Sequence, residues 1–125
     1  MNVVDSSAWL EYLAAGPNAA FFADAIENVS ELVVPTISIY EVFKRIVQQR
    51  SENEALQVVA VMQQGRVSEM DSTVALSAAR ISIDHRLPMA DSVMLATARL
   101  NNATLWTQDA HFEGLPQVKY KRSSS

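Results

Sequence analysis

The chain has 125 residues, of which 49% are apolar and 19% are charged. This length suits one domain, and the composition is that of a globular protein with a packed core rather than a disordered chain. Because cysteine is absent, disulfides, thiol catalysis and thiolate-bound metals are excluded, whereas hard cations with oxygen ligands remain possible. The net charge of -4 argues against a protein that coats nucleic acid through a broad basic surface. Any contact with nucleic acid would be local, assisted by metal, or completed by a second subunit.

The first residues, Met1-Asn2-Val3-Val4-Asp5, contain neither a basic opening nor an apolar run of signal-peptide length. No later stretch approaches the length of a membrane span. We therefore expect a cytoplasmic protein without membrane association. We predict a single domain over residues 1–125, in which the polar residues 121–125 form a solvated tail.

Short runs of strand-forming residues occupy positions 1–4, 32–34, 66–70 and 104–107, and residues 118–120 are a candidate edge strand. Helix-forming segments lie at residues 7–15, 19–28, 38–50, 52–64, 72–85 and 89–101. Strands separated by helices pair in parallel through right-handed crossovers, with helices on both faces of the sheet. The sequence thus predicts an α/β fold, a three-layer α/β/α sandwich with a mostly parallel central sheet.

Four carboxylates are expected at the carboxyl ends of these strands, where parallel α/β sheets collect their ligands. Asp5 and Asp109 each follow a strand, and Glu41 and Asp91 each lie in the first turn of a predicted helix. Like charges in one crevice repel and are costly to bury, unless a cation lies among them. Mg²⁺ or Mn²⁺ would fit, and such ions polarise phosphates and lower the pKa of bound water. The pattern is typical of a metal-dependent nuclease.

Each carboxylate also has a structural interpretation. Asp5 can be a helix N-cap, and Ser38-Ile39-Tyr40-Glu41 matches a capping box, in which the glutamate returns to the backbone of the cap residue. Asp91 can complement a helix dipole, and Asp109 can be a turn residue. No single residue decides between these interpretations. The functional inference depends on all four carboxylates sharing one edge of the sheet.

Four segments then carry a resemblance to a known family: Val3-Val4-Asp5-Ser6-Ser7, Ile37-Ser38-Ile39-Tyr40-Glu41-Val42, Leu87-Pro88-Met89-Ala90-Asp91-Ser92 and Leu105-Trp106-Thr107-Gln108-Asp109-Ala110-His111-Phe112. In order and spacing they resemble the PIN-domain family, and in particular its short VapC-like toxins, over nearly the whole chain. The resemblance implies a compact α/β fold that binds Mg²⁺ or Mn²⁺ and cleaves single-stranded or loop RNA, leaving 5′-phosphate ends. It also implies a homodimer that a cognate antitoxin holds inactive, as in type II toxin–antitoxin systems.

Carried over residue by residue, the resemblance makes Asp5, Glu41, Asp91 and Asp109 the catalytic, metal-binding acids. Ser6 and Thr107 match positions with small hydroxyl side chains, which could hydrogen-bond the metal-binding acids and orient them without touching the metal. Both can equally be cap or turn residues. His111 stands where many members of the family carry a further acid, which leaves Asp109 as the only acid of its motif.

Two further groups invite functional roles. The unperturbed pKa of histidine suits proton transfer, which makes His111 a candidate base, but a metal-bound water needs no such base and a loop histidine is more often structural or solvated. Lys44 and Arg45 lie one turn beyond Glu41 and are candidates for contact with RNA phosphates. A basic pair on a helix is, however, typical of a solvated face.

Two other functions remain open at this point. One is a PIN scaffold that keeps its acids but serves as a binding or regulatory module without turnover. The other is a phosphoaspartate receiver or a phosphatase-like α/β protein. Against the second, Ser7 stands where a second acid would follow Asp5, and no lysine directly follows the strand at residues 104–107.

Overall fold

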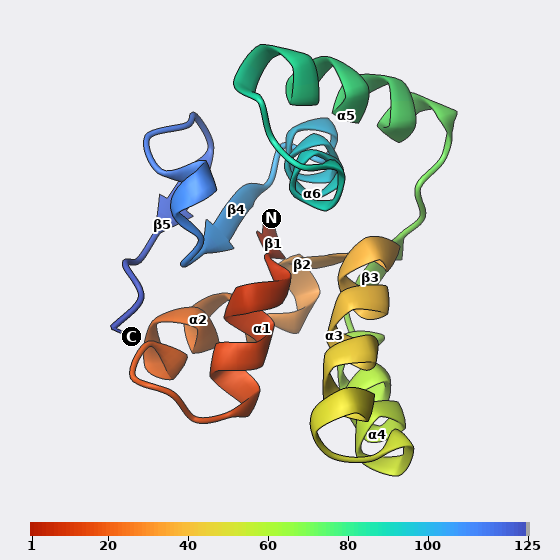
Figure 1. Ribbon diagram of the computed structural model, residues 1–125, viewed down its shortest axis with the longest axis vertical. Coiled ribbons are helices and arrows are strands. Elements are labelled where there is room, and N and C mark those ends of the chain that lie inside the picture. Colours follow the sequence, from red (N-terminus) through yellow and green to blue (C-terminus); the bar gives the residue numbers. More distant parts are fainter. Residues whose placement is uncertain (125) are drawn as a thin grey trace.

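The computed structural model describes residues 1–124, and Figure 1 shows their arrangement. Its elements are, in chain order, β1 (Asn2–Val4), α1 (Ser6–Leu13), α2 (Ala19–Ile26), the 3₁₀ helix η1 (Val29–Glu31), β2 (Leu32–Pro35), α3 (Thr36–Gln49), α4 (Glu52–Met62), β3 (Arg66–Ser68), α5 (Ser72–His85), α6 (Met89–Leu100), β4 (Thr104–Thr107), the 3₁₀ helix η2 (Ala110–Phe112) and β5 (Val118–Tyr120). Every predicted helix and strand is confirmed, with ends that move by no more than two residues.

The strands form one parallel sheet in the order β3-β2-β1-β4-β5. The predicted parallel pairing is confirmed, and residues 118–120 do form the edge strand β5. The first strand is central, since Val3 pairs with Val33 on one side and with Leu105 on the other. The loops that follow β1, β2 and β4 therefore begin side by side at one edge of the sheet.

Successive residues of the central strands enter two separate cores, as the two-residue period of a strand requires. Val3, Val33 and Leu105 pack with α5 and α6 on one face. Their neighbours in the sequence, Val4, Val34 and Trp106, pack with α1, α2, α3 and α4 on the other. Figure 1 shows α5 and α6 on one side of the sheet and α1, α2 and α3 on the other. The predicted three-layer sandwich is confirmed.

Two helices place residues of the candidate site. Helix α6 is buried without interruption from Ser92 to Ala98, so Asp91 in its first turn is held by a helix that cannot shift without disturbing the core. Helix α3 is amphipathic instead. It buries Ser38, Val42 and Ile46, spaced four residues apart, and turns its other side toward solvent.

The described part of the predicted tail follows β5. The backbone N–H of Lys121 donates to the carbonyl of Thr107 at 2.9 Å, and the Asn18 side-chain amide donates to the carbonyl of Arg122 at 3.0 Å. These bonds place residues 121 and 122 against β4 and the start of α2, while Ser125 lies outside the described residues. Within residues 1–124, no helix combines the length and the apolar character needed to cross a membrane.

Candidate functional site

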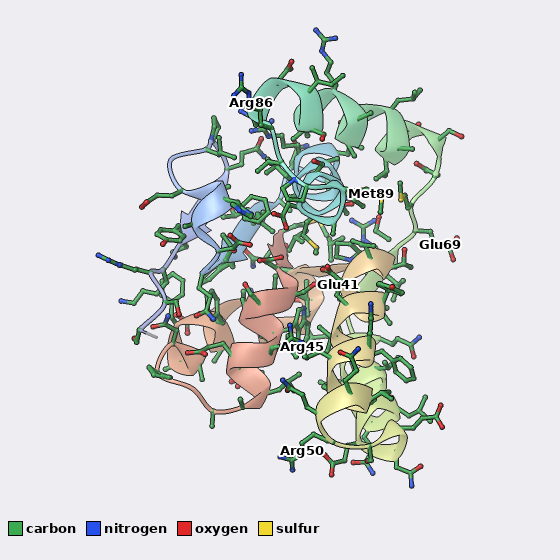
Figure 2. The ribbon with its side chains drawn as sticks, viewed as in Figure 1. Glu41, Arg45, Arg50, Glu69, Arg86 and Met89 are labelled. Carbon is green, nitrogen blue, oxygen red and sulfur yellow. The ribbon has the colours of Figure 1, made fainter. Side chains whose placement is uncertain are left out.

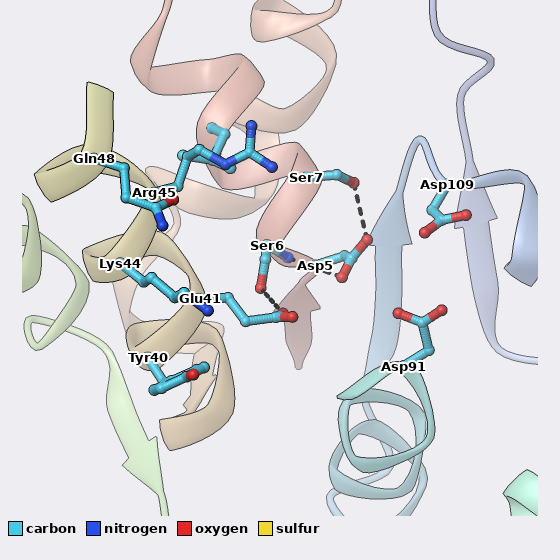
Figure 3. Close-up of a pocket in the computed structure, with 11 residues that line it drawn as sticks. Asp5, Ser6, Ser7, Tyr40, Glu41, Lys44, Arg45, Gln48, Asp91 and Asp109 are labelled. Carbon is cyan, nitrogen blue, oxygen red and sulfur yellow. Dashed lines mark hydrogen bonds between the residues drawn. The ribbon is translucent and has the colours of Figure 1, made fainter. Parts of the chain in front are cut away.

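A pocket of about 410 Å³ opens at the carboxyl ends of β1 and β4, between α1, α3 and the start of α6 (Figure 3). It brings together side chains from segments far apart in the sequence. Its lining comprises Asp5, Ser6, Ser7, Leu10, Tyr40, Glu41, Lys44, Arg45, Gln48, Asp91 and Asp109. All four predicted acids, Ser6 and both predicted basic residues are among them, and Thr107 lies directly behind Asp5. A pocket of this size is in the range that holds small ligands.

Asp5 is the most deeply placed acid, with 3% of its surface exposed. One carboxylate oxygen, Oδ1, accepts from the backbone N–H of Ser6 at 2.8 Å, which makes Asp5 the N-cap of α1. The other, Oδ2, accepts from the hydroxyls of Ser7 and Thr107, both at 2.9 Å. Asp5 is thus an N-cap and a pocket residue at once, so the two interpretations of this residue do not exclude each other.

Burial raises the pKa of Asp5 to about 6. The hydroxyls of Ser7 and Thr107 oppose this increase, and the nearby carboxylates of Asp91 and Asp109 add to it. The groups that hydrogen-bond Asp5 are neutral, so they orient the carboxylate without neutralising its charge. A cation in the pocket would supply the missing compensation.

Asp109 lies two residues after Thr107, the last residue of β4. Its backbone N–H donates to the Thr107 hydroxyl oxygen at 2.9 Å, while that hydroxyl donates to Asp5. The buried Thr107 side chain therefore fixes two acids relative to each other. The Asp109 carboxylate also accepts from the backbone N–H of His111 at 2.9 Å, as the N-cap of η2.

Asp91 reaches the same region from α6, with 15% of its side chain exposed. Burial raises the pKa of Asp91, while its hydrogen bond with His111 lowers it and the Asp109 carboxylate raises it again. The first turn of a helix favours a negative charge, so the helix-dipole interpretation is compatible with this position. Asp5, Asp91 and Asp109 thus converge from three elements on one part of the pocket, as Figure 3 shows.

His111 lies between two of these acids. Its Nδ1 atom is 2.9 Å from Asp91 Oδ2 and 3.4 Å from Asp109 Oδ1. The hydrogen bond with Asp91 raises the pKa of His111, and the Asp109 carboxylate adds to this shift. Asp91, Asp109 and His111 each offer one ligand atom, and these atoms lie within 4.8 Å of one another. Sequence reasoning did not foresee the contact with Asp91, because the two residues belong to separate elements.

Glu41 lies on the opposite side of Asp5, on α3, as Figure 3 shows. Its Oε1 atom accepts from the Ser6 hydroxyl at 2.7 Å. The capping-box interpretation of Glu41 is wrong, because α3 begins at Thr36 rather than at Ser38. Ser38 lies inside the helix, where its hydroxyl donates to the carbonyl of Pro35. The Glu41 side chain is therefore free to turn toward α1.

The α3 side of the pocket also carries Lys44, Arg45, Tyr40 and Gln48. Lys44 lies with its Nζ atom 5.7 Å from the centre of the Tyr40 ring. Figure 2 shows Arg45 near Glu41 between α1 and α3, whereas Arg50 lies at the far end of α3. Tyr40, Gln48 and Ser7 were not among the predicted residues. The helical period would have indicated the first two, because Tyr40, Lys44 and Gln48 are spaced four residues apart.

The donor chemistry of the pocket fits a hard divalent cation. Asp5, Asp91 and Asp109 offer carboxylate oxygens, the ligands that Mg²⁺ and Mn²⁺ prefer, and the Asp109 carboxylate raises the pKa of both Asp5 and Asp91 in the absence of a cation. The hydroxyls of Ser7 and Thr107 already orient Asp5. The basic residues on α3 could contact a negatively charged ligand bound at the same place.

The comparisons with known proteins agree with this fold. A sequence profile described as the PIN domain matches residues 3–117. A toxin–antitoxin complex from Klebsiella pneumoniae contains a similar chain, with a TM-score of 0.79 and 20% identity, covering 95% of this chain and 96% of that chain. The sarcin-ricin loop cleaving toxin VapC20 of Mycobacterium tuberculosis gives a TM-score of 0.76 at 13% identity, covering 93% and 95%. FitAcB from Neisseria gonorrhoeae gives 0.74 at 20% identity, covering 96% of each chain.

No curated protein sequence matches the chain. At these low identities the solved structures establish the fold, while the profile match spans most of the 125 residues. The parallel sheet and the acids at its carboxyl edge agree with that match. The chain belongs to the PIN-domain family.

Proposed function

We propose that this protein is a Mg²⁺- or Mn²⁺-dependent endoribonuclease that acts as the toxin of a toxin–antitoxin pair. The observation that carries this proposal is the buried Asp5 carboxylate, which neutral donors hold beside Asp91 and Asp109. Desolvated carboxylates close together are unfavourable unless a cation joins them. Membership of the PIN-domain family makes a phosphodiester the substrate that such a cation would activate.

In the proposed reaction, a water oxygen attacks the phosphorus in line with the leaving O3′ atom. The water gives up a proton to solvent as the P–O bond forms, the P–O3′ bond breaks, and O3′ takes up a proton from solvent, which leaves a 5′-phosphate and a 3′-hydroxyl. The bound cation supplies Lewis acidity and a water of lowered pKa. Asp5, Asp91 and Asp109 would hold it, with Glu41 facing them across the pocket. Ser6, Ser7 and Thr107 keep the carboxylates in place through their hydrogen bonds.

Lys44 and Arg45 are the proposed contacts for the RNA backbone. Both are exposed and both line the pocket, so a phosphate group can lie between them and the aspartates. The net charge of -4 makes the binding of RNA local, because no broad excess of positive charge attracts it. A single-stranded or loop segment fits this arrangement, since its backbone can enter a pocket that a rigid duplex would not.

A cognate antitoxin is the proposed protein partner. The similar chain from Klebsiella pneumoniae belongs to a toxin–antitoxin complex. A basic side chain of an antitoxin would find compensating charge at the same aspartates and would displace the cation. Co-expression with the product of the adjacent small open reading frame should therefore suppress cleavage. Purified protein that this product neither binds nor inhibits would contradict the partnership.

We also propose a homodimer. Leu76 and Ile83 lie seven residues apart on the same face of α5 and are 75% and 71% exposed. Large exposed apolar residues on one helix face are characteristic of an association surface. Light scattering of the Leu76→Asp/Ile83→Asp double variant should give a monomer where the wild-type protein gives a dimer. If the wild-type protein and the double variant have the same mass in solution, the protein does not dimerise through α5.

The nuclease activity is tested by incubating a panel of cellular RNAs with purified protein in Mg²⁺, Mn²⁺ or EDTA. Cleavage should require the cation and should be lost in Asp5→Asn. The matched control is Asp24→Asn, which changes an exposed aspartate of α2 in the same way and should cleave like wild type. If the folded, antitoxin-free protein binds metal but leaves every RNA intact, a binding or regulatory role without turnover replaces the nuclease.

A further inference from the structure

We infer that His111 is a nitrogen ligand of the cation in the pocket and that it makes the site prefer Mn²⁺ to Mg²⁺. This inference rests on the proposed metal dependence and goes beyond it, because the predicted acids offer only oxygen ligands. His111 is not one of those acids, and the sequence alone favours a structural or solvated loop histidine.

The spacing of the donor atoms matches one coordination sphere. Neighbouring ligands of an octahedral cation with bonds of about 2.1 Å lie about 3.0 Å apart. The Nδ1 atom of His111 lies 2.9 Å from Asp91 Oδ2 and 3.4 Å from Asp109 Oδ1. One ligand atom of each of the three residues lies within 4.8 Å of the others, so side-chain rotations could bring these atoms into adjacent positions around one ion.

The backbone around His111 supports this position. The N–H of His111 donates to Asp109 Oδ1, so the residue that carries the imidazole is tied to one of the proposed ligands. The next residue, Phe112, is fully buried in the core beneath α6. The imidazole itself is 58% exposed, which leaves it accessible to an entering ion, and its contacts with Asp91 and Asp109 connect it to the lining of the pocket. The main chain is thus fixed while the ring remains accessible.

The chemistry of the ligand set then determines the selectivity. Mg²⁺ strongly prefers oxygen ligands and keeps several waters, whereas imidazole nitrogen suits transition-metal ions. Exchanging one oxygen or water ligand for nitrogen therefore favours Mn²⁺ over Mg²⁺. A histidine that only oriented Asp91 from outside the coordination sphere would change the affinity for both ions by a similar factor.

Pulsed electron paramagnetic resonance of the tag-free, Mn²⁺-loaded protein tests the coordination directly. A nitrogen ligand modulates the electron spin echo at the frequencies of ¹⁴N. The chain has two histidines, and the other, His85, ends α5. The modulation should therefore be present in wild type and in His85→Asn, and absent in His111→Asn. Wild-type protein that binds Mn²⁺ without this modulation would overturn the inference.

Isothermal titration calorimetry without RNA tests the selectivity. For His111→Asn we expect the affinity for Mn²⁺ to fall about tenfold or more, within the range for altered metal sites, and the affinity for Mg²⁺ to fall much less. His111→Asp should shift the preference further toward Mg²⁺, because it replaces the nitrogen donor with an oxygen donor. An unchanged ratio of the two affinities in both variants, or a wild-type protein that binds neither ion, would overturn the inference.

Both measurements are independent of turnover, so the two proposals can fail separately. Cleavage of RNA by the same samples is measured in parallel. Nitrogen coordination with no cleavage under any condition would reject the nuclease and leave His111 as a ligand. Metal-dependent cleavage without a nitrogen signal would support the nuclease and reject His111.

Discussion

The two sides of the pocket hold their side chains in different ways. On the aspartate side, Asp5 and Asp109 follow neighbouring strands and share the buried hydroxyl of Thr107. On the α3 side, Lys44 and Arg45 are long, exposed side chains on one face of a helix. The first side has one fixed geometry, which suits a cation with strict demands on its ligands. The second can adjust to a substrate that differs from one RNA to the next.

The largest difference between the two sides should appear in catalysis. Asp5→Asn removes a charge that the fold holds in place, and we expect RNA cleavage to fall by more than about 100-fold, because even residues behind the ligands change metal sites by about 10–100-fold. Glu41→Gln alters a residue held by the single hydroxyl of Ser6 and should retain more activity. Single-turnover cleavage rates at saturating Mn²⁺ measure both variants. Equal losses would contradict the distinction.

The same Asp5→Asn change should increase the stability of the metal-free protein. The pKa of Asp5 rises from 3.8 to about 6 on folding. The stability that comes from the protonated Asp5 side chain is fully present below about pH 4 and is lost as the pH rises through 6. The stability lost by pH 7 is as much as ~3 kcal/mol at 1.36 kcal/mol per pKa unit, and the variant, whose side chain does not ionise, should recover it. Urea unfolding at several pH values measures the free energy of unfolding.

The control for stability is again Asp24→Asn, whose exposed side chain predicts a difference from wild type within ~0.5 kcal/mol at every pH. Added Mn²⁺ should stabilise wild type and leave Asp5→Asn nearly unaffected. A variant that is less stable than wild type at pH 7 without metal would mean that the hydrogen bonds of the carboxylate outweigh its desolvation.

Thr107 and Ser6 allow a smaller, more local comparison. Thr107→Val removes the hydroxyl that donates to Asp5 and accepts from Asp109, and should cost about 1–3 kcal/mol of unfolding free energy. Its metal affinity should fall by about 10–100-fold, and Thr107→Ser should restore most of it. Ser6→Ala removes one hydrogen bond to Glu41 and should have the smaller effect on metal affinity. Calorimetric titration with Mn²⁺ ranks the variants.

The smallest expected effect is on the α3 side. The Lys44→Ala/Arg45→Ala double variant should raise KM for RNA several-fold while kcat stays close to wild type, because these side chains are proposed to bind phosphate rather than metal. The dependence of RNA binding on salt should also weaken, by about 0.7 in the log–log slope for each phosphate that the variant no longer neutralises. Arg80→Ala on α5 is the control. A large fall in kcat would give these residues a direct part in the reaction.

The predictable parts of the fold and of the site are those that local patterns determine. Apolar runs between helical segments identified every strand, and the positions of Asp5 and Asp109 followed from the strand ends. The capping-box interpretation of Glu41 failed because the N-cap of the helix is Pro35, three residues before the serine that the motif would make the cap. The contact between His111 and Asp91 depends on how η2 packs beside α6, and no local pattern encodes that packing.

The direction of β1 also places Met1 and Arg122 at opposite edges of the sheet with respect to the pocket. Met1 lies at the amino end of the central strand, where its amino group pairs with Glu31 at 3.6 Å. The pocket lies at the opposite edge, near Gln108, whose side chain accepts from the same Asn18 amide that binds the carbonyl of Arg122. A fusion partner or fluorophore attached at the first residue would therefore leave from the far edge. One attached directly after Arg122 would leave from the edge that holds Gln108 and would obstruct access to RNA.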